Sequence, residues 1–199
     1  MIRFLCALWL AGCAWQAQAA TILVFGDSLS AGYGIRQEAA WPALLEQRLH
    51  EKRLDYSVVN ASISGETSAG GRARLAEALH KHHPKVLILA LGANDGLRGL
   101  PLPTLQGNLL AMTDIARKNK AKVLLVGMRL PPNYGAYASA FAEVFAHVAD
   151  SRQLAFAPFL LDGIAARREL FQADGLHPLA EAQTQLLDNV WPPLLPLLK

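Results

Sequence analysis

The chain has 199 residues, of which 52% are hydrophobic and 18% are charged, and its formal net charge is +3. This length suits one domain of roughly 100–200 residues, and the hydrophobic content excludes a disordered chain. The small net charge gives no sign of a nucleic-acid partner.

Residues 1–19 have the pattern of a signal peptide, which is removed on export. Arg3 provides the positive start, and residues 4–15 form an uncharged apolar run of twelve residues. Ala17-Gln18-Ala19 then has the small-x-small pattern after which signal peptidase cuts. The run is too short to span a bilayer, which takes about 20 residues. We therefore expect an exported protein, periplasmic or secreted, with no transmembrane segment and with residues 20–199 as its mature domain.

Cys13 leaves a second mode of export open. Leu10-Ala11-Gly12-Cys13 matches a lipobox, after which Cys13 would carry a lipid anchor. That cut shortens the apolar run to residues 4–12, so we favour cleavage after Ala19. Cys6 lies in the same segment, so the favoured cut leaves neither a disulfide, nor a thiol nucleophile, nor a Cys-based metal site.

Five short apolar runs alternate with longer amphipathic stretches along the rest of the chain. The runs lack a polar alternation, as is typical of strands that are covered on both faces. The predicted strands are residues 21–26, 57–62, 86–92, 123–128 and 154–159. The predicted helices are residues 41–53, 68–82, 103–119, 136–152 and 180–198. This order predicts an α/β fold with a parallel sheet, whose ligands bind beyond the carboxyl ends of the strands.

Ser28 follows the first predicted strand, in Gly26-Asp27-Ser28-Leu29-Ser30. A serine at this place, between glycines and at the start of a helix, is where a nucleophile would be presented. The same segment also fits a serine that merely caps a helix after a tight turn. Taken alone, it leaves both interpretations open.

Asp174 and His177 lie near the other end of the chain. An Asp three residues before a His can bind the imidazole Nδ1–H and leave Nε2 free to accept a proton from a serine. A loop aspartate followed by a histidine that caps a helix before Pro178 would give the same spacing.

Two further loops provide hydrogen-bond donors at the same predicted edge of the sheet. Gly65 has no Cβ to keep a substrate from its N–H, and Asn94 follows the third strand. Together with the Ser28 N–H, these groups would form an oxyanion hole. Each residue alone fits an ordinary turn, but four such blocks in four loops favour a catalytic site.

Together the four blocks resemble the SGNH (GDSL) hydrolase family. Longer segments are similar to the bacterial periplasmic thioesterase I group of that family, whose members are also described as lysophospholipases and arylesterases. These segments are residues 60–68, 92–99 and 129–135, and the resemblance runs from about residue 21 to residue 198.

The resemblance implies a flavodoxin-like three-layer α/β/α sandwich with a five-stranded parallel sheet in the order 2-1-3-4-5. It also implies that Ser28 is the nucleophile, that His177 is the general base and then acid, and that Asp174 orients His177. The oxyanion hole would consist of the N–H groups of Ser28 and Gly65 and the Asn94 side chain. The implied reaction is a two-step acyl transfer that needs no cofactor.

An apolar groove for the acyl chain is expected beside these residues. The loops after the third and fourth strands flank the site and are rich in Leu and Pro. In the group that the chain resembles, the first of these loops moves over the acyl chain, and Gly96 and Gly99 would suit such a lid. The expected substrate-binding residues are Leu97, Leu100, Leu130 and Tyr134.

These observations predict an exported serine esterase that acts on small-molecule carboxylic esters, thioesters or lysophospholipids with apolar acyl chains. One alternative is an SGNH esterase that deacetylates a sugar or cell-wall polymer, which would need a polar, aromatic-lined cleft. Another is a non-hydrolytic flavodoxin-like module that binds a phosphate or flavin. That module would give Asn94, Asp174 and His177 no role.

We expect neither a metal nor an organic cofactor. His80-Lys81-His82-His83 lies before the third strand, away from the predicted site, and includes no cysteine. A monomer is expected because no apolar surface stripe calls for a partner.

Overall fold

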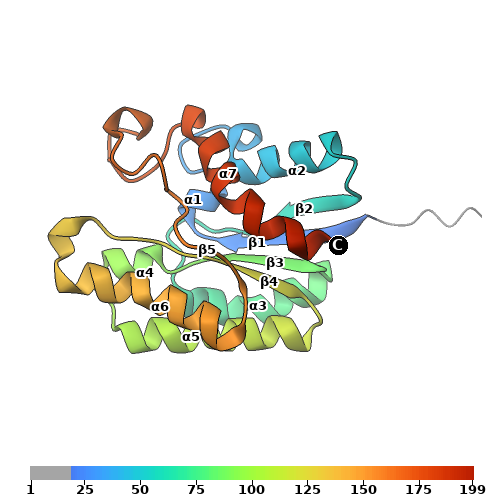
Figure 1. Ribbon diagram of the computed structural model, residues 1–199, viewed down its shortest axis with the longest axis horizontal. Coiled ribbons are helices and arrows are strands. Elements are labelled where there is room, and N and C mark those ends of the chain that lie inside the picture. Colours follow the sequence, from blue (N-terminus) through green and yellow to red (C-terminus); the bar gives the residue numbers. More distant parts are fainter. Residues whose placement is uncertain (1–18) are drawn as a thin grey trace, which may run out of the picture.

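A five-stranded parallel β-sheet forms the central layer of the protein (Figure 1). The computed structural model describes residues 19–199. The spatial order of the strands is β2-β1-β3-β4-β5, so the predicted fold class is confirmed. The strands are β1 (Ala20–Gly26), β2 (Tyr56–Asn60), β3 (Val86–Ala90), β4 (Lys122–Val126) and β5 (Ala155–Ala157).

β1 begins directly after the predicted signal segment. That segment, residues 1–19, lies outside the described residues except for Ala19, and so do both cysteines. The Ala20 N–H donates to the Asp55 carbonyl at 3.1 Å, and Ala20 pairs with Tyr56 of β2. Within the part of the chain that the structure describes, no helix has the length and apolar character needed to cross a bilayer.

Helices cover both faces of the sheet. α2 (Trp41–Glu51) and α7 (Gln183–Leu194) lie on one side in Figure 1, and α3 (Ser68–His82), α5 (Leu102–Lys118) and α6 (Ala136–Arg152) lie on the other. Alternate residues of β1 divide between the two layers. Ile22 and Val24 pack with α2 and α7, whereas Leu23 and Phe25 pack with α3, α5 and α6. Successive side chains of a strand point to opposite faces, so a strand that is covered on both needs an unbroken apolar run.

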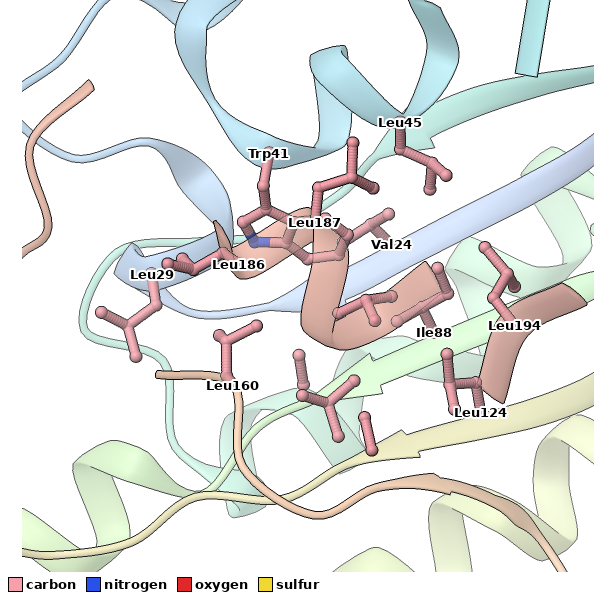
Figure 2. Close-up of a cluster of buried hydrophobic side chains, with 14 of the residues drawn as sticks. Val24, Leu29, Trp41, Leu45, Ile88, Leu124, Leu160, Leu186, Leu187 and Leu194 are labelled. Carbon is pink, nitrogen blue, oxygen red and sulfur yellow. The ribbon is translucent and has the colours of Figure 1, made fainter. Parts of the chain in front are cut away.

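One of the two cores joins the two ends of the chain (Figure 2). Trp41 and Leu45 of α2 and Leu187 of α7 meet Val24 of β1, and all four are at most 1% exposed. Burying a side chain of this kind contributes about 1.5–3 kcal/mol relative to exposure. The backbone N–H of Trp41 also donates to Oε1 of Gln183 at 3.0 Å. These contacts fix the segment just before α7 relative to the loop after β1.

Several element ends differ from the predicted ones. β2, β3 and β4 end at Asn60, Ala90 and Val126, two residues earlier than predicted in each case, because the residues beyond leave the ladder to form loops. β5 is short because, as an edge strand, it pairs only with β4. The predicted helix 180–198 is α7 flanked by two 3₁₀ turns, Ala180–Ala182 and Leu195–Leu198. Pro192 and Pro193 lack the N–H groups that would continue the α-helical bonding.

Candidate active site

Ser28 is the first residue of a short helix, α1 (Ser28–Ala31), that follows β1 directly. Asp27 caps this helix, and its Oδ1 accepts the Leu29 N–H at 3.1 Å. The turn requires a glycine at position 26, because a Cβ there would lie 2.7 Å from Oγ of Ser30 and 2.9 Å from the Ala90 carbonyl. The sharp turn thus presents the Ser28 side chain at the carboxyl edge of the sheet.

The structure brings Ser28, His177 and Asp174 into one chain of hydrogen bonds. His177 Nε2 lies 2.9 Å from Oγ of Ser28, and its Nδ1 lies 2.7 Å from Oδ2 of Asp174. An ionised carboxylate can only accept, so the Nδ1 proton is held on the Asp174 side and Nε2 is left as an acceptor for the serine O–H. This arrangement prepares Ser28 to lose its proton to the imidazole.

Asp174 is held in its charged form by three hydrogen bonds. Besides the His177 ring, its Oδ1 accepts the backbone N–H groups of Leu176 at 2.9 Å and of His177 at 3.1 Å. These bonds lower the pKa of Asp174 to about 2, and the bond from the His177 ring has the largest effect. The carboxylate is therefore ionised throughout the neutral range and keeps His177 in one orientation.

The loop that carries Asp174 and His177 is braced by contacts that the sequence patterns did not indicate. Arg168 donates from Nη1 to the Gln172 carbonyl at 2.9 Å and from Nη2 to the Ala173 carbonyl at 2.8 Å. Gln172 in turn donates from Nε2 to the Tyr33 carbonyl at 2.8 Å, and the Tyr33 ring lies 4.5 Å from the His177 ring. The loops after β1 and β5 thus support each other around the imidazole.

Three hydrogen-bond donors lie in the loops around Ser28. Gly65 has a φ of +79° in the turn after β2. Asn94 lies in α4 (Ala93–Leu97), a helix that has no counterpart among the predicted elements because five residues are too few to show a helical period. Asn94 Nδ2 donates to the Glu66 carbonyl at 3.0 Å, which leaves its second N–H free. Among residues 19–199, the backbone N–H groups of Ser28 and Gly65 donate to no protein acceptor.

A buried polar network holds the Asn94 helix in place. Asp95 is 3% exposed and accepts from Ser68, whose N–H lies 2.8 Å from Oδ2 and whose Oγ lies 2.5 Å from Oδ1. Asn108 donates from Nδ2 to Oγ of Ser68 at 3.0 Å. Because each buried polar group here has a partner, the network fixes α4 to α3 and α5 rather than weakening the core.

Gly96 does not have the hinge role that we expected of it. A Cβ at Gly96 would lie 2.6 Å from the ring of Phe141, so this glycine is needed for close packing of α4 against α6. Gly99, in contrast, has a φ of +63° and open space around it. Only Gly99 retains the conformational freedom that a mobile loop requires.

An apolar cavity of about 380 Å³ opens beside Ser28 and His177. Leu97 and Leu130, two of the four expected substrate-binding residues, line it together with Asn94. The sequence patterns missed five further apolar side chains of the lining, which come from the segments after β4 and β5. They are Met128, Phe159, Leu161, Phe171 and Leu176. Arg129 also lies on the wall, with its guanidinium 5.1 Å from the centre of the Phe159 ring.

Leu100 and Tyr134 lie outside this cavity, contrary to expectation. The Tyr134 hydroxyl donates to the Leu97 carbonyl at 3.3 Å, so this side chain holds the backbone at the end of α4. Leu100 is 36% exposed, and its carbonyl accepts from the Tyr137 hydroxyl at 2.7 Å. Both residues position the loop that follows Asn94 and do not contact the cavity.

Residues 19–199 contain no group of three or more His, Cys, Asp and Glu side chains that could hold a metal ion. The run of His and Lys at residues 80–83 lies at the end of α3, at the amino edge of the sheet.

The sheet, the Ser28–His177–Asp174 contacts and the adjacent apolar cavity define a serine hydrolase of ester bonds. The chain belongs to the GDSL-like lipase/acylhydrolase family, whose profile matches residues 24–184. It is 50% identical to the esterase TesA of Pseudomonas aeruginosa over 199 aligned positions, which cover 96% of this chain and 99% of that protein. It is 42% identical over 183 positions to the thioesterase 1/protease 1/lysophospholipase L1 of Escherichia coli, covering 91% and 86%.

A solved structure supports the same relationship. The crystal structure of TesA superposes on this chain with a TM-score of 0.87 at 50% identity, covering 89% of this chain and 99% of the other. The predicted family and the predicted class of enzyme are therefore confirmed.

Asp27, beside Ser28, provides a test of the electrostatics under the site. Burial raises the pKa of Asp27 to about 7, so the folded protein keeps a proton that the unfolded chain releases near pH 4. The free energy of unfolding should then fall as the pH rises from about 4 to about 7. In Asp27→Asn the side chain stays neutral and its oxygen still accepts the Leu29 N–H.

We expect Asp27→Asn to gain stability relative to the parent protein between pH 4.5 and pH 8, by roughly 1–4 kcal/mol. Urea unfolding at both pH values measures this difference. A difference between the two proteins that does not change with pH would show that Asp27 is ionised in the folded state.

Proposed function

We propose that the protein is an exported serine esterase that hydrolyses carboxylic esters and thioesters with apolar acyl chains, including lysophospholipids. The observation that carries this proposal is the hydrogen-bonded Ser28, His177 and Asp174 at the mouth of an apolar cavity. The names of the related proteins, esterase and thioesterase 1/lysophospholipase L1, point to the same bonds.

The first half of the reaction acylates Ser28. Its Oγ attacks the carbonyl carbon while His177 Nε2 takes the hydroxyl proton, and Asp174 stabilises the imidazolium that forms. The negative charge on the carbonyl oxygen is received by the N–H groups of Ser28 and Gly65 and by the second N–H of Asn94. His177 then returns its proton to the departing alcohol or thiol.

The second half releases the acid. A water molecule gives a proton to His177 and attacks the acyl-enzyme, and the same donors receive the second oxyanion. Ser28 recovers its proton from His177 when the intermediate collapses. Every proton has a donor and an acceptor among these residues, so the steps require no cofactor.

The cavity supports apolar acyl chains over acetyl groups as substrates. Its volume lies within the ~300–1,000 Å³ of typical ligand sites, and it is lined by Leu, Met and Phe side chains. Each buried CH₂ contributes about 0.8 kcal/mol, so a medium or long chain gains more here than an acetyl group. A deacetylase of sugar polymers would need a polar cleft, which these side chains do not form.

The Ser28→Ala variant tests the nucleophile. We expect kcat on p-nitrophenyl esters to fall by a factor of about 10⁴–10⁶, because no other group forms the acyl-enzyme. The esters should run from C2 to C16, since the parent protein should prefer chains well above C2. Equal activity of the two proteins would contradict the assignment of Ser28, and an optimum at C2 would favour the deacetylase.

The Asn94→Ala variant tests the oxyanion hole separately. Loss of one donor should lower kcat by a factor of about 10²–10³ and leave KM within a few-fold, because the donor acts mainly on the transition state. Circular dichroism should match that of the parent, since Asp95 and its network remain. A change in KM alone would instead show that Asn94 only binds substrate.

The N-terminus of the mature protein tests the export proposal. Cleavage after Ala19 would make Ala20, which pairs with Tyr56 at the start of β1, the first residue of the mature chain. We expect the intact mass of protein from the periplasm of a Gram-negative host to correspond to residues 20–199. A mass that includes Cys13 and a diacylglycerol group, absent in Cys13→Ser, would establish the lipid anchor instead.

A further inference from the structure

Exposed apolar side chains gather at the mouth of the active site. Within residues 19–199, five large hydrophobic side chains are exposed, and four of them lie in loops at the carboxyl edge of the sheet. These four are Tyr33 (52% exposed), Ile63 (50%), Leu100 (36%) and Leu176 (45%), and we call them the apolar rim. The fifth, Leu195 (38%), lies at the other end of the molecule, beyond α7. Figure 1 shows these two ends, with α1 and α4 at the left and the C-terminus at the right.

Two of the four rim residues adjoin the catalytic site. The Tyr33 ring lies 4.5 Å from the ring of His177, and Leu176, the residue before His177, lines the cavity while remaining exposed. Ile63 lies in the same turn as Gly65. Leu100 lies in the loop that follows α4, and its carbonyl accepts a hydrogen bond from Tyr137. The cavity thus opens next to the rim.

Hydrogen bonds to the backbone hold the rim in its exposed position. The Ile63 N–H donates to the Gly26 carbonyl at 3.0 Å, and the Leu100 N–H donates to the Asp95 carbonyl at 2.9 Å. The Tyr33 carbonyl accepts from Gln172 at 2.8 Å. Loops held in this way keep these residues at the surface. Their apolar side chains therefore stay in contact with water until a binding partner covers them. Apolar groups gathered around a binding site are typical of an interaction surface.

The distribution of charge indicates the kind of partner. The segments that precede β2, β3 and β4 form the amino edge, where residues 48–56, 81–86 and 117–122 hold nine Lys or Arg and two acidic residues. The carboxyl-edge loops, residues 27–40, 61–67, 92–101, 127–135 and 158–179, hold five Lys or Arg and seven acidic residues. Two of these acidic residues, Asp27 and Asp95, are buried, so the exposed charges of the face that carries the rim are about balanced. Such a face suits a surface without net charge and offers no excess of positive charge to an anionic one.

We infer that the apolar rim docks the protein onto the surface of zwitterionic lipid aggregates, such as micelles of a lysophospholipid. This inference rests on the proposed function. The rim enters the layer below the headgroups, so a single acyl chain passes from the aggregate into the cavity without crossing water. The amino edge faces away from the lipid.

Binding to hexadecylphosphocholine micelles tests the inference without turnover, because this lipid has no carboxylic ester bond. We expect the parent protein to bind above the critical micelle concentration, as measured by cosedimentation or light scattering. The Ile63→Ser/Leu100→Ser variant should bind about tenfold more weakly, whereas the matched control Leu195→Ser should bind like the parent. Neither rim position in the double variant lines the cavity.

Three outcomes of this measurement would overturn the inference. The first is that the parent protein does not bind the micelles. The second is that the double variant binds as well as Leu195→Ser. The third is that binding is lost in Lys118→Glu/Lys120→Glu but kept in the double variant, which would place the docking surface at the amino edge.

Kinetics separate the inference from the proposed function. We expect hydrolysis of palmitoyl-lysophosphatidylcholine to rise steeply as micelles form, and the rise to be lost in the double variant. The rate of each protein on soluble p-nitrophenyl butyrate serves as its own reference, and the rise with micelles is expressed relative to that rate. A parent protein that hydrolyses the butyrate but shows no rise with micelles would keep the proposed function and refute the docking. Failure to hydrolyse the butyrate at all would refute the proposed function, and micelle binding would still decide the docking.

Discussion

The hydrogen bond between His177 and Ser28 is the contact around which the rest of the site is arranged. It joins residues 149 positions apart at 2.9 Å, and the two elements that carry them come from opposite ends of the chain. The packing of α2 on α7 and the bond from Trp41 to Gln183 bring these ends together. A hydrogen bond of this kind contributes only about 0.5–1.5 kcal/mol to folding. The hydrophobic core, not the hydrogen bond, therefore determines the geometry.

In the loop after β3, too, groups outside the site set the position of a residue in the site. Asn94 provides a donor to the site, but its position is set by its neighbour Asp95, which is buried and bonded to Ser68. A buried carboxyl group without partners would weaken the core, whereas one that accepts hydrogen bonds selects a single arrangement of the backbone. Gly96 completes this arrangement by allowing α4 to contact Phe141. Specific polar bonding thus gives the site its rigidity.

The two ends of the sheet differ in character as well as in position. At the amino edge, helix C-termini carry basic residues, which suits the negative end of the helix dipole. At the carboxyl edge, the loops carry the reactive groups, an apolar cavity and exposed hydrophobic side chains. Parallel strands place all such loops at one edge, so the proposed chemistry, the acyl-chain cavity and the proposed lipid-docking surface share that edge.

Most of the framework could be predicted from local patterns in the sequence. Unbroken apolar runs such as residues 86–90 predicted buried strands, and the blocks around Ser28, Gly65, Asn94 and His177 indicated the family and its reaction. These signals are local, because a strand, a helix or a catalytic motif depends on residues close together in the chain. Element ends were less certain, since the last residue of a strand depends on the length of its neighbour.

The lining of the cavity was decided only by the tertiary structure. Leu97 and Leu100 are only three residues apart in one apolar stretch of sequence, yet only Leu97 lines the cavity. The hydroxyl groups of Tyr134 and Tyr137 bind the carbonyls of these two residues and so fix the loop. Phe159 and Phe171 reach the cavity from segments with no catalytic motif. Loops have no periodicity that would reveal which side chains point inward. The sequence by itself therefore determined the fold and indicated the candidate reactive groups, whereas the packing of distant segments determined which side chains surround those groups.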